Sequence, residues 1–278
     1  MTVGIVGLGL IGGSVAKAIK TSTEHRVLGA DTNGATMDAA LADGAADGIL
    51  SAETLRECDI LLLAVYPHAA IDFVRQNARH IARGARVVDL CGVKRMLCEA
   101  LEPLAHEMGF VFIGGHPMAG KERFGYGVSQ ADLFAGASMI LTPPEGTPRD
   151  VVTELASFFL SLGFERVCLS DAREHDRRIA YTSQLAHILS SAYVKSPLAI
   201  AHEGFSAGSF QDMTRVATMN EDMWTELFLA NRDDLAEEVD ALRNRLAAYG
   251  DALRAGDEAQ LRALIREGCE WKEKASRR

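Results

Sequence analysis

The chain has 278 residues, 48% of them hydrophobic, and a formal net charge of -9 at pH 7. This length allows one large domain or two modest ones, and the negative charge argues against a nucleic-acid partner. No apolar run approaches the roughly 18 residues that a membrane helix needs, and Met1 leads directly into an apolar stretch rather than a signal peptide. We therefore expect a globular cytoplasmic protein that does not bind membranes.

The five cysteines are an odd number, are scattered along the chain and form no Cys-x-x-Cys pair. This pattern is typical of free thiols in a reducing compartment. The histidines, cysteines and acids also show no metal-ligand spacing, so we expect no metal site.

Short apolar runs bounded by Gly, Asp and Pro alternate with helical stretches through the first 171 residues. This alternation predicts an α/β fold, a Rossmann-type doubly wound and mostly parallel sheet. The expected strands are Gly4–Val6, Val27–Asp31, Ile60–Ala64, Arg86–Asp89, Val111–Gly114, Met139–Thr142 and Arg166–Leu169.

The first strand runs straight into Gly7-x-Gly9-x-x-Gly12 and then into a helical stretch. In a dinucleotide fingerprint, the first glycine allows a tight turn, the second lets the backbone approach a pyrophosphate, and the third lets the helix pack on the strand. The helix N-terminus would then hold the phosphates. The alternative is a glycine-rich turn that binds nothing. The expected cofactor-binding residues here are Gly7, Leu8, Gly9, Leu10, Ile11 and Gly12.

Asp31 closes the second strand, nineteen residues after Gly12. A carboxylate at this position accepts the ribose hydroxyls of the cofactor and repels a 2′-phosphate. The following segment, residues 32–37, contains no Arg or Lys to receive such a phosphate. The sequence therefore favours NAD over NADP.

From residue 172 onward the chain shows helical patterns only. We expect a nucleotide-binding domain at residues 1–171 and an all-helical substrate and dimerisation domain at residues 172–278. Its first helix should span Glu174–Val194 and end before Pro197, and Asp257-x-x-Gln260 should begin the last helix. A heptad-like apolar stripe, which predicts a homodimer or equally a core within the domain, comprises Leu235, Val239, Leu242, Leu246, Tyr249 and Leu253.

His116 follows a strand that ends in two glycines, and Lys94 follows the strand that ends at Asp89. The carboxyl ends of strands in an open α/β sheet face the ligand crevice. A neutral imidazole there could take a proton from a substrate hydroxyl, and we expect Lys94 to reach the rim of the crevice. The alternatives are a hydrogen-bonded turn histidine and a surface lysine.

Two pairs in the helical region share a helix face: Ser183 with His187, and Asp212 with Arg215. Asp212 could orient the Arg215 guanidinium, which would then receive a carboxylate. On spacing alone, a core contact is the more common explanation of the first pair and a surface ion pair that of the second, and Trp224 is typical of a core residue.

Three blocks together resemble the prephenate dehydrogenase family, which includes the similar arogenate and cyclohexadienyl dehydrogenases. The resemblance covers nearly the whole chain. The blocks, of which the second is far more specific than the glycine fingerprint, are Gly7-x-Gly9-x-x-Gly12-Gly13-Ser14, Gly115-His116-Pro117-Met118-Ala119-Gly120-Lys121-Glu122, and Asp212-Met213-Thr214-Arg215-Val216-Ala217 with Trp224.

The resemblance implies that NAD accepts a hydride from prephenate, which loses CO2 and becomes 4-hydroxyphenylpyruvate in tyrosine biosynthesis. It implies that His116 takes the proton of the ring hydroxyl and that Arg215 binds a substrate carboxylate. It also implies a homodimer through the helical domain. Further residues expected at the substrate site are Ser183, His187, Lys94, Lys121, Glu122 and Trp224.

The chain departs from the family pattern at Cys91-Gly92-Val93-Lys94, where many relatives read Gly-Ser-Val-Lys. The serine hydroxyl that would help to orient the histidine is therefore missing. We expect Gly92 to hold a backbone conformation that serine tolerates poorly.

Three alternative functions remain open. An arogenate dehydrogenase would perform the same chemistry on a substrate with an amino acid side chain, and the sequence does not decide between the two. A β-hydroxyacid dehydrogenase would carry a lysine in the first long helix of its second domain, and Glu174–Val194 contains none. A non-catalytic NAD-sensing protein would not need His116 and Arg215.

Overall fold

The computed structural model describes residues 1–276. The chain forms two compact units, Met1–Asn231 and Arg232–Arg278. The units are described separately below.

The first unit, all of whose residues are described, is built on an eight-stranded sheet with the order β3-β2-β1-β4-β5-β6-β7-β8. All neighbouring strands are parallel except β6 and β7. The strand order reverses between β1 and β4, which is where an open α/β sheet binds its ligands. The strands are β1 (Thr2–Val6), β2 (Arg26–Ala30), β3 (Gly48–Ile49), β4 (Ile60–Leu63), β5 (Arg86–Asp89), β6 (Val111–Pro117), β7 (Ser138–Thr142) and β8 (Arg166–Leu169).

The predicted mostly parallel sheet is confirmed, with two differences. Strand β3 was not predicted, because two residues are too short to show a pattern. Strand β6 continues past the expected end at Gly114 to Pro117, because His116 pairs with Ile140 of the antiparallel β7. His116 is therefore part of the sheet rather than of a following loop.

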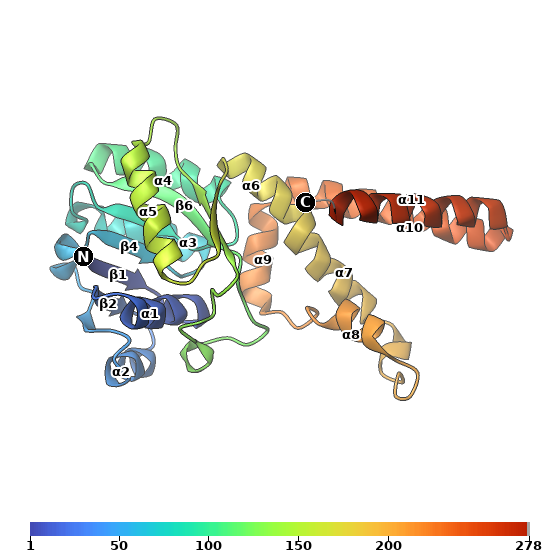
Figure 1. Ribbon diagram of the computed structural model, residues 1–278, viewed down its shortest axis with the longest axis horizontal. Coiled ribbons are helices and arrows are strands. Elements are labelled where there is room, and N and C mark those ends of the chain that lie inside the picture. Colours follow the sequence, from blue (N-terminus) through green and yellow to red (C-terminus); the bar gives the residue numbers. More distant parts are fainter. Residues whose placement is uncertain (277–278) are drawn as a thin grey trace. The chain divides into compact units, whose positions relative to one another are not determined.

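Helices cover both faces of the sheet (Figure 1). One face packs against α1 (Leu10–Ser22), α2 (Gly34–Ala42) and α5 (Arg149–Ser161), and the other against α3 (Pro67–Asn77) and α4 (Arg95–Met108). Because successive strand side chains point to opposite faces, Ile5 belongs to the first core and Val6 to the second.

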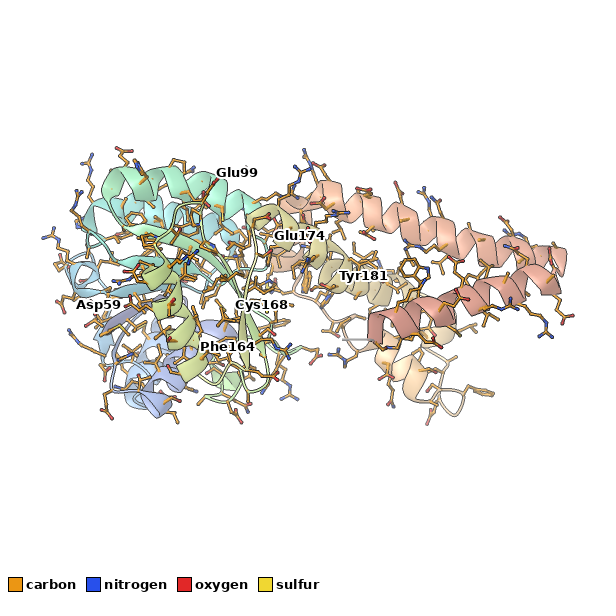
Figure 2. All side chains as sticks on the ribbon, turned by 45° about the horizontal axis from the view of Figure 1, so that its top comes forward. Asp59, Glu99, Phe164, Cys168, Glu174 and Tyr181 are labelled. Atoms are coloured by element: carbon orange, nitrogen blue, oxygen red, sulfur yellow. The ribbon has the colours of Figure 1, made fainter. Side chains whose placement is uncertain are left out.

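The predicted helix Glu174–Val194 is present as one helical segment that contains a π-helical turn. It runs from α6 (Ala172–Ile179) through a π-helical turn (Ala180–Gln184) into α7 (Leu185–Tyr193). The Asp171 carboxylate caps its start by accepting from the backbone N–H of Glu174. Tyr181 on the turn is 58% exposed, and the turn was not predicted (Figure 2).

The remaining helices of the first unit are α8 (Gly208–Thr214) and α9 (Glu221–Ala230). Leu227 of α9 is buried in the core that α3 and α4 form on the sheet. By packing, these helices therefore belong with the sheet, and the chain divides after Asn231. A functional boundary at residue 171 stays a prediction.

The second unit consists, within its described residues, of α10 (Arg232–Ala255) and α11 (Glu258–Ser276). Gly256, with φ +64°, makes the turn between them, and the predicted start of the last helix is confirmed because Asp257 caps the Gln260 N–H. The Tyr249 hydroxyl donates to the carbonyl of Leu264, so the two helices pack together. Two members of the apolar stripe remain exposed, Leu246 by 56% and Leu253 by 65%. Among residues 1–276, no helix is long and apolar enough to cross a membrane.

Candidate active site

A cavity of about 570 Å³ opens at the carboxyl ends of the parallel strands of the first unit. Its wall includes the segments that follow three strands, Gly9–Ile11 after β1, Ala64–Pro67 after β4 and Leu90–Gly92 after β5, and it includes His116 near the end of β6. Residues from α7, α9 and the segment around Arg215 complete it. The cavity thus joins the glycine-rich turn, the His116 block and the helical region.

The glycine-rich turn has the backbone that the fingerprint predicts. Gly7 has φ +87°, and a Cβ at Gly12 would lie 1.8 Å from the carbonyl oxygen of Gly7, so neither position accepts a side chain. At Gly9, by contrast, a Cβ would meet no protein atom within 4 Å. The space over Gly9 is open, and it lies where a pyrophosphate would approach the N-terminus of α1.

Of the six fingerprint residues, Gly9, Leu10 and Ile11 line the cavity. Leu8 is fully buried in the core. Asp31, directly after β2, accepts hydrogen bonds from the backbone N–H groups of Leu8 and Asn33, each at 2.8 Å. The carboxylate is thereby fixed beside the turn, as a ribose-binding acid requires, and its role toward a cofactor stays a prediction.

His116 lies at the end of β6 and lines the cavity. The preceding Gly115 is required by packing, because a Cβ there would lie 2.6 Å from the carbonyl oxygen of Asp89. Burial lowers the pKa of His116 well below its ordinary value, and positive charge on the neighbouring His175 or Lys94 lowers it further. The imidazole is therefore neutral at pH 7 and is able to accept a proton.

Two residues that the sequence analysis did not identify hold His116. Its Nδ1 lies 2.9 Å from Nε2 of His175, and Nδ1 of His175 lies 2.7 Å from Oδ1 of Asp176. His175 is 2% exposed and Asp176 is fully buried. No local signal distinguishes them, because in sequence they are two polar residues among the charges of α6.

The prediction that Lys94 reaches the crevice rim is wrong. Its side chain is fully buried, does not line the cavity and forms an ion pair with the equally buried Asp89. A charge removed from water needs such a partner, and Asp89 supplies it five residues earlier in the chain. From outside the cavity lining, the charge of Lys94 lowers the pKa of the His116 imidazole.

The expected pairing of Asp212 with Arg215 is also wrong. The Arg215 guanidinium instead contacts Glu122, with Nη1 2.6 Å from Oε1. The reason is that Arg215 follows α8 and turns toward the loop after β6, where Glu122 lies. Both Arg215 and Glu122 line the cavity, and Arg215 remains 68% exposed.

Ser183, His187 and Trp224 also line the cavity. The Nδ1 of His187 lies 2.9 Å from the carbonyl oxygen of Ser183 and must donate to it, which leaves Nε2 unprotonated in the neutral ring. The rings of His187 and Trp224 lie with centroids 3.9 Å apart. Burial lowers the pKa of His187, so this wall of the cavity is aromatic and neutral.

Lys121 completes the set of predicted cavity residues. It is exposed, lines the cavity and donates to Gln130. Together with Arg123 and Arg215 it gives the wall three cationic side chains against the single carboxylate of Glu122. The cavity therefore favours an anionic ligand although the chain as a whole is acidic.

The expectation for Gly92 is not supported by its backbone. Gly92 does not belong to the glycines with positive φ, and a Cβ there would lie 3.4 Å from the Cδ atoms of Leu227. That distance is ordinary van der Waals contact, so the position accepts a small side chain. Backbone strain therefore does not explain why this chain has Gly92 where many relatives have serine.

Two family models match the chain. The model described as prephenate dehydrogenase, nucleotide-binding domain, covers residues 15–167, and the one described as prephenate dehydrogenase, dimerization domain, covers residues 171–267. The chain is 29% identical to a prephenate dehydrogenase of Lactococcus lactis subsp. cremoris over an alignment of 276 residues. This alignment covers 95% of this chain and 74% of that protein. It is 30% identical to a cyclohexadienyl dehydrogenase of Zymomonas mobilis over an alignment of 251 residues, and this alignment covers 86% of this chain and 83% of that protein.

Solved structures show the same architecture. A prephenate dehydrogenase of A. aeolicus, in complex with hydroxyphenyl propionate and NAD+, is 26% identical with a TM-score of 0.86, over 98% of each chain. A Synechocystis arogenate dehydrogenase, 24% identical with a TM-score of 0.81 over 99% of this chain and 100% of that one, shares the fold. Both the sheet and the helical region are therefore common to these proteins.

Proposed function

The chain belongs to the prephenate dehydrogenase family, and we propose on this basis that it oxidises and decarboxylates prephenate with NAD. The products are 4-hydroxyphenylpyruvate, CO2 and NADH, in the biosynthesis of tyrosine. One observation of this structure carries the proposal: a neutral His116 lines the same cavity as the open backbone of Gly9 and the guanidinium of Arg215.

The residues present fit a dinucleotide. The space over Gly9 would be filled by a Cβ, and the first N–H groups of α1 have no side-chain cap. Gly9, Leu10 and Ile11 would hold the pyrophosphate, and Asp31 would accept the ribose hydroxyls. When bound, NAD supplies the acceptor for the hydride of the substrate ring.

His116 would act as the general base. The ring hydroxyl of prephenate would donate a hydrogen bond to Nε2, and its proton would pass to that atom as hydride leaves the same ring carbon. Once loss of CO2 has made the ring aromatic, Nε2 would return this proton to the phenolate oxygen. The low pKa of His116 keeps Nε2 free to accept the proton. Because aromatisation of the ring drives the reaction, the chain's own residues need only align the substrate and manage one proton.

Arg215 and Lys121 would bind the carboxylates of the substrate. A guanidinium offers two parallel donors to a planar anion, whereas an ammonium acts as a point charge. Ser183, His187 and Trp224 would form the wall against which the ring packs. Glu122 would hold the Arg215 guanidinium at the cavity while no substrate is present.

We also propose that the chain works as a cytoplasmic homodimer. All five cysteines, which lie within the described residues, are free, as is usual in a reducing compartment. The family model of residues 171–267 is described as a dimerization domain, and the exposed apolar side chains of α10 offer a surface for a second copy.

The test is the formation of NADH by the purified chain with prephenate or arogenate, each with NAD or NADP. We expect activity with prephenate and NAD, and much less with NADP. Activity with arogenate but not with prephenate would show that the substrate is arogenate, which carries an amino acid side chain. No NADH from either substrate would contradict the proposal.

A further inference from the structure

A chain of hydrogen bonds extends from His116 away from the cavity. It links Nδ1 of His116 to Nε2 of His175 over 2.9 Å, and Nδ1 of His175 to Oδ1 of Asp176 over 2.7 Å. The two imidazole rings meet edge to face, with centroids 5.1 Å apart and planes at 62°. Neither His175 nor Asp176 lines the cavity, so neither touches a substrate bound there.

Asp176 sets the direction of the hydrogen bonds. Burial opposes its ionisation, but the hydrogen bonds from His175 and from the backbone N–H groups of Arg95 and Lys94 outweigh burial and hold its pKa below the usual range. Since an ionised carboxylate only accepts hydrogen bonds, Nδ1 of His175 must carry the proton. Burial is the main cause that lowers the pKa of His175, so its ring is neutral and its Nε2 holds a lone pair.

The same reasoning fixes the tautomer of His116. The lone pair on Nε2 of His175 accepts from Nδ1 of His116, which must therefore be the protonated nitrogen of that ring. Nε2 of His116 is left without a proton and is the nitrogen available to the cavity. The opposite tautomer would set two lone pairs against each other between the rings.

Other charged groups adjoin this chain of hydrogen bonds. Lys94 and Asp89 form a buried ion pair, and Arg95 contacts Asp176. The charge of Lys94 opposes protonation of both imidazoles, whereas those of Asp89 and Asp176 favour the protonated form of His175. Of the two rings, only that of His116 lines the cavity and can receive a substrate proton. The ring of His175 stays neutral when this proton is transferred.

We infer that His175 and Asp176 are positioning residues for the general base, which fix the tautomer and the ring orientation of His116 and stabilise its protonated form. This inference rests on the proposed function. The proton of the substrate hydroxyl moves to Nε2 of His116, and the imidazolium keeps its Nδ1–H bond to His175. No proton moves to His175 or Asp176.

Two variants of His175 test the inference, and both leave Asp176 to hold the backbone of Lys94 and Arg95. In His175→Gln the amide oxygen takes the place of Nε2 and still accepts from His116, whereas His175→Phe fills the space without an acceptor. We expect the Phe variant to lose roughly 10- to 100-fold in kcat, the range seen when a supporting hydrogen bond is removed. The KM values for prephenate and NAD should change little, and the Gln variant should recover most of the rate.

The pH profile separates positioning from a merely structural role. Without an acceptor at Nδ1 the imidazolium of His116 is less stable, so the acid limb of kcat should move to lower pH in His175→Phe but much less in His175→Gln. Equal losses in both variants, with an unmoved acid limb, would overturn the inference. Thermal melting of each variant checks that it folds.

The tautomer is measured without substrate. In the free, ¹⁵N-histidine-labelled chain, the resonances of His116 are assigned by their loss in His116→Asn. We expect a protonated Nδ1 and an unprotonated Nε2, and the reverse pattern would overturn the inference. Failure of the wild-type chain to turn over prephenate or arogenate would instead contradict the proposed function, and the NMR result would still report on the hydrogen bonds.

Discussion

Arg215 and Glu122, which are 93 residues apart in the sequence, meet at the mouth of the cavity with Nη1 2.6 Å from Oε1. The contact joins the segment after α8 to the loop after β6. A hydrogen bond from the backbone, and after it the contact with Arg215, holds the pKa of Glu122 below its usual value. Both side chains are substantially exposed, so the pair adds little to stability. Its consequence is the placement of a guanidinium beside the site.

Replacing Arg215 by Ala should raise KM for prephenate roughly 10- to 100-fold, since a lost hydrogen bond to a charged group costs about 1.5–3 kcal/mol. KM for NAD should hardly change. Arg215→Lys should recover only part of the loss, because lysine keeps the charge but not the two parallel donors. Steady-state kinetics with each ligand varied in turn measures these effects.

Asp212→Ala is the matched control for Arg215. Asp212 lies three residues away and is exposed, and Arg215 pairs with Glu122 instead. We expect unchanged kinetics. A rise in KM for prephenate equal to that of Arg215→Ala would show that Asp212 holds the guanidinium after all.

His116→Asn should reduce kcat by roughly 10²- to 10⁴-fold, as expected for a lost general base, with NAD binding preserved. Because burial, together with the charge of Lys94, depresses the pKa of His116, the wild-type base stays unprotonated as the pH falls through 6.5. We therefore expect kcat/KM for prephenate to stay level through pH 6.5 and to fall only at lower pH. An acid limb centred at or above pH 6.5 would contradict this assignment.

Asp31→Asn should narrow the preference for NAD over NADP, because it removes the charge that repels a 2′-phosphate. The preference should not reverse, since residues 32–37 offer no Arg or Lys. The amide oxygen can accept from only one of the N–H groups of Leu8 and Asn33, so thermal melting is measured beside the kinetics to check that the variant folds. The ratio of kcat/KM for the two cofactors is the readout, and an unchanged ratio would assign selectivity to other residues.

Gly92→Ser should fold normally and keep or raise kcat, since its backbone is not in the left-handed region and a Cβ only touches Leu227. Gly92→Leu is the control, because its larger side chain must displace Leu227 and should lower the melting temperature. Loss of activity in the serine variant, with an unchanged melting temperature, would show that the space beside Gly92 is needed by a ligand.

The chain should sediment as a dimer of about 60 kDa, twice the 30.0 kDa of one chain. Leu246→Asp should weaken association at micromolar concentration, because it places a charge in the exposed apolar stripe of α10. Asn244→Asp makes the same change of charge on an exposed position off the stripe and should leave the dimer intact. Association that both variants leave unaltered would place the interface elsewhere.

The sequence by itself determined those features that follow from local chemistry. Short apolar runs bounded by Gly, Asp and Pro predicted seven strands, because a parallel strand that is buried on both faces carries apolar side chains at nearly every position. The Gly7–Gly12 turn was predictable from local sterics: Gly7 and Gly12 both stand where the nearby backbone leaves no room for a side chain, and a Cβ at Gly12 would lie 1.8 Å from the carbonyl oxygen of Gly7.

Only the tertiary structure decided which polar groups meet. Lys94 is buried on Asp89, Arg215 pairs with Glu122, and His116 bonds to His175. The last two pairs are 93 and 59 residues apart, and hydrogen bonds and ion pairs act only at contact distance, so sequence spacing carries no trace of them. The spacing of Asp212 and Arg215 suggested a pair, but the stronger constraint was the path of the backbone, which brings Arg215 to the loop that carries Glu122.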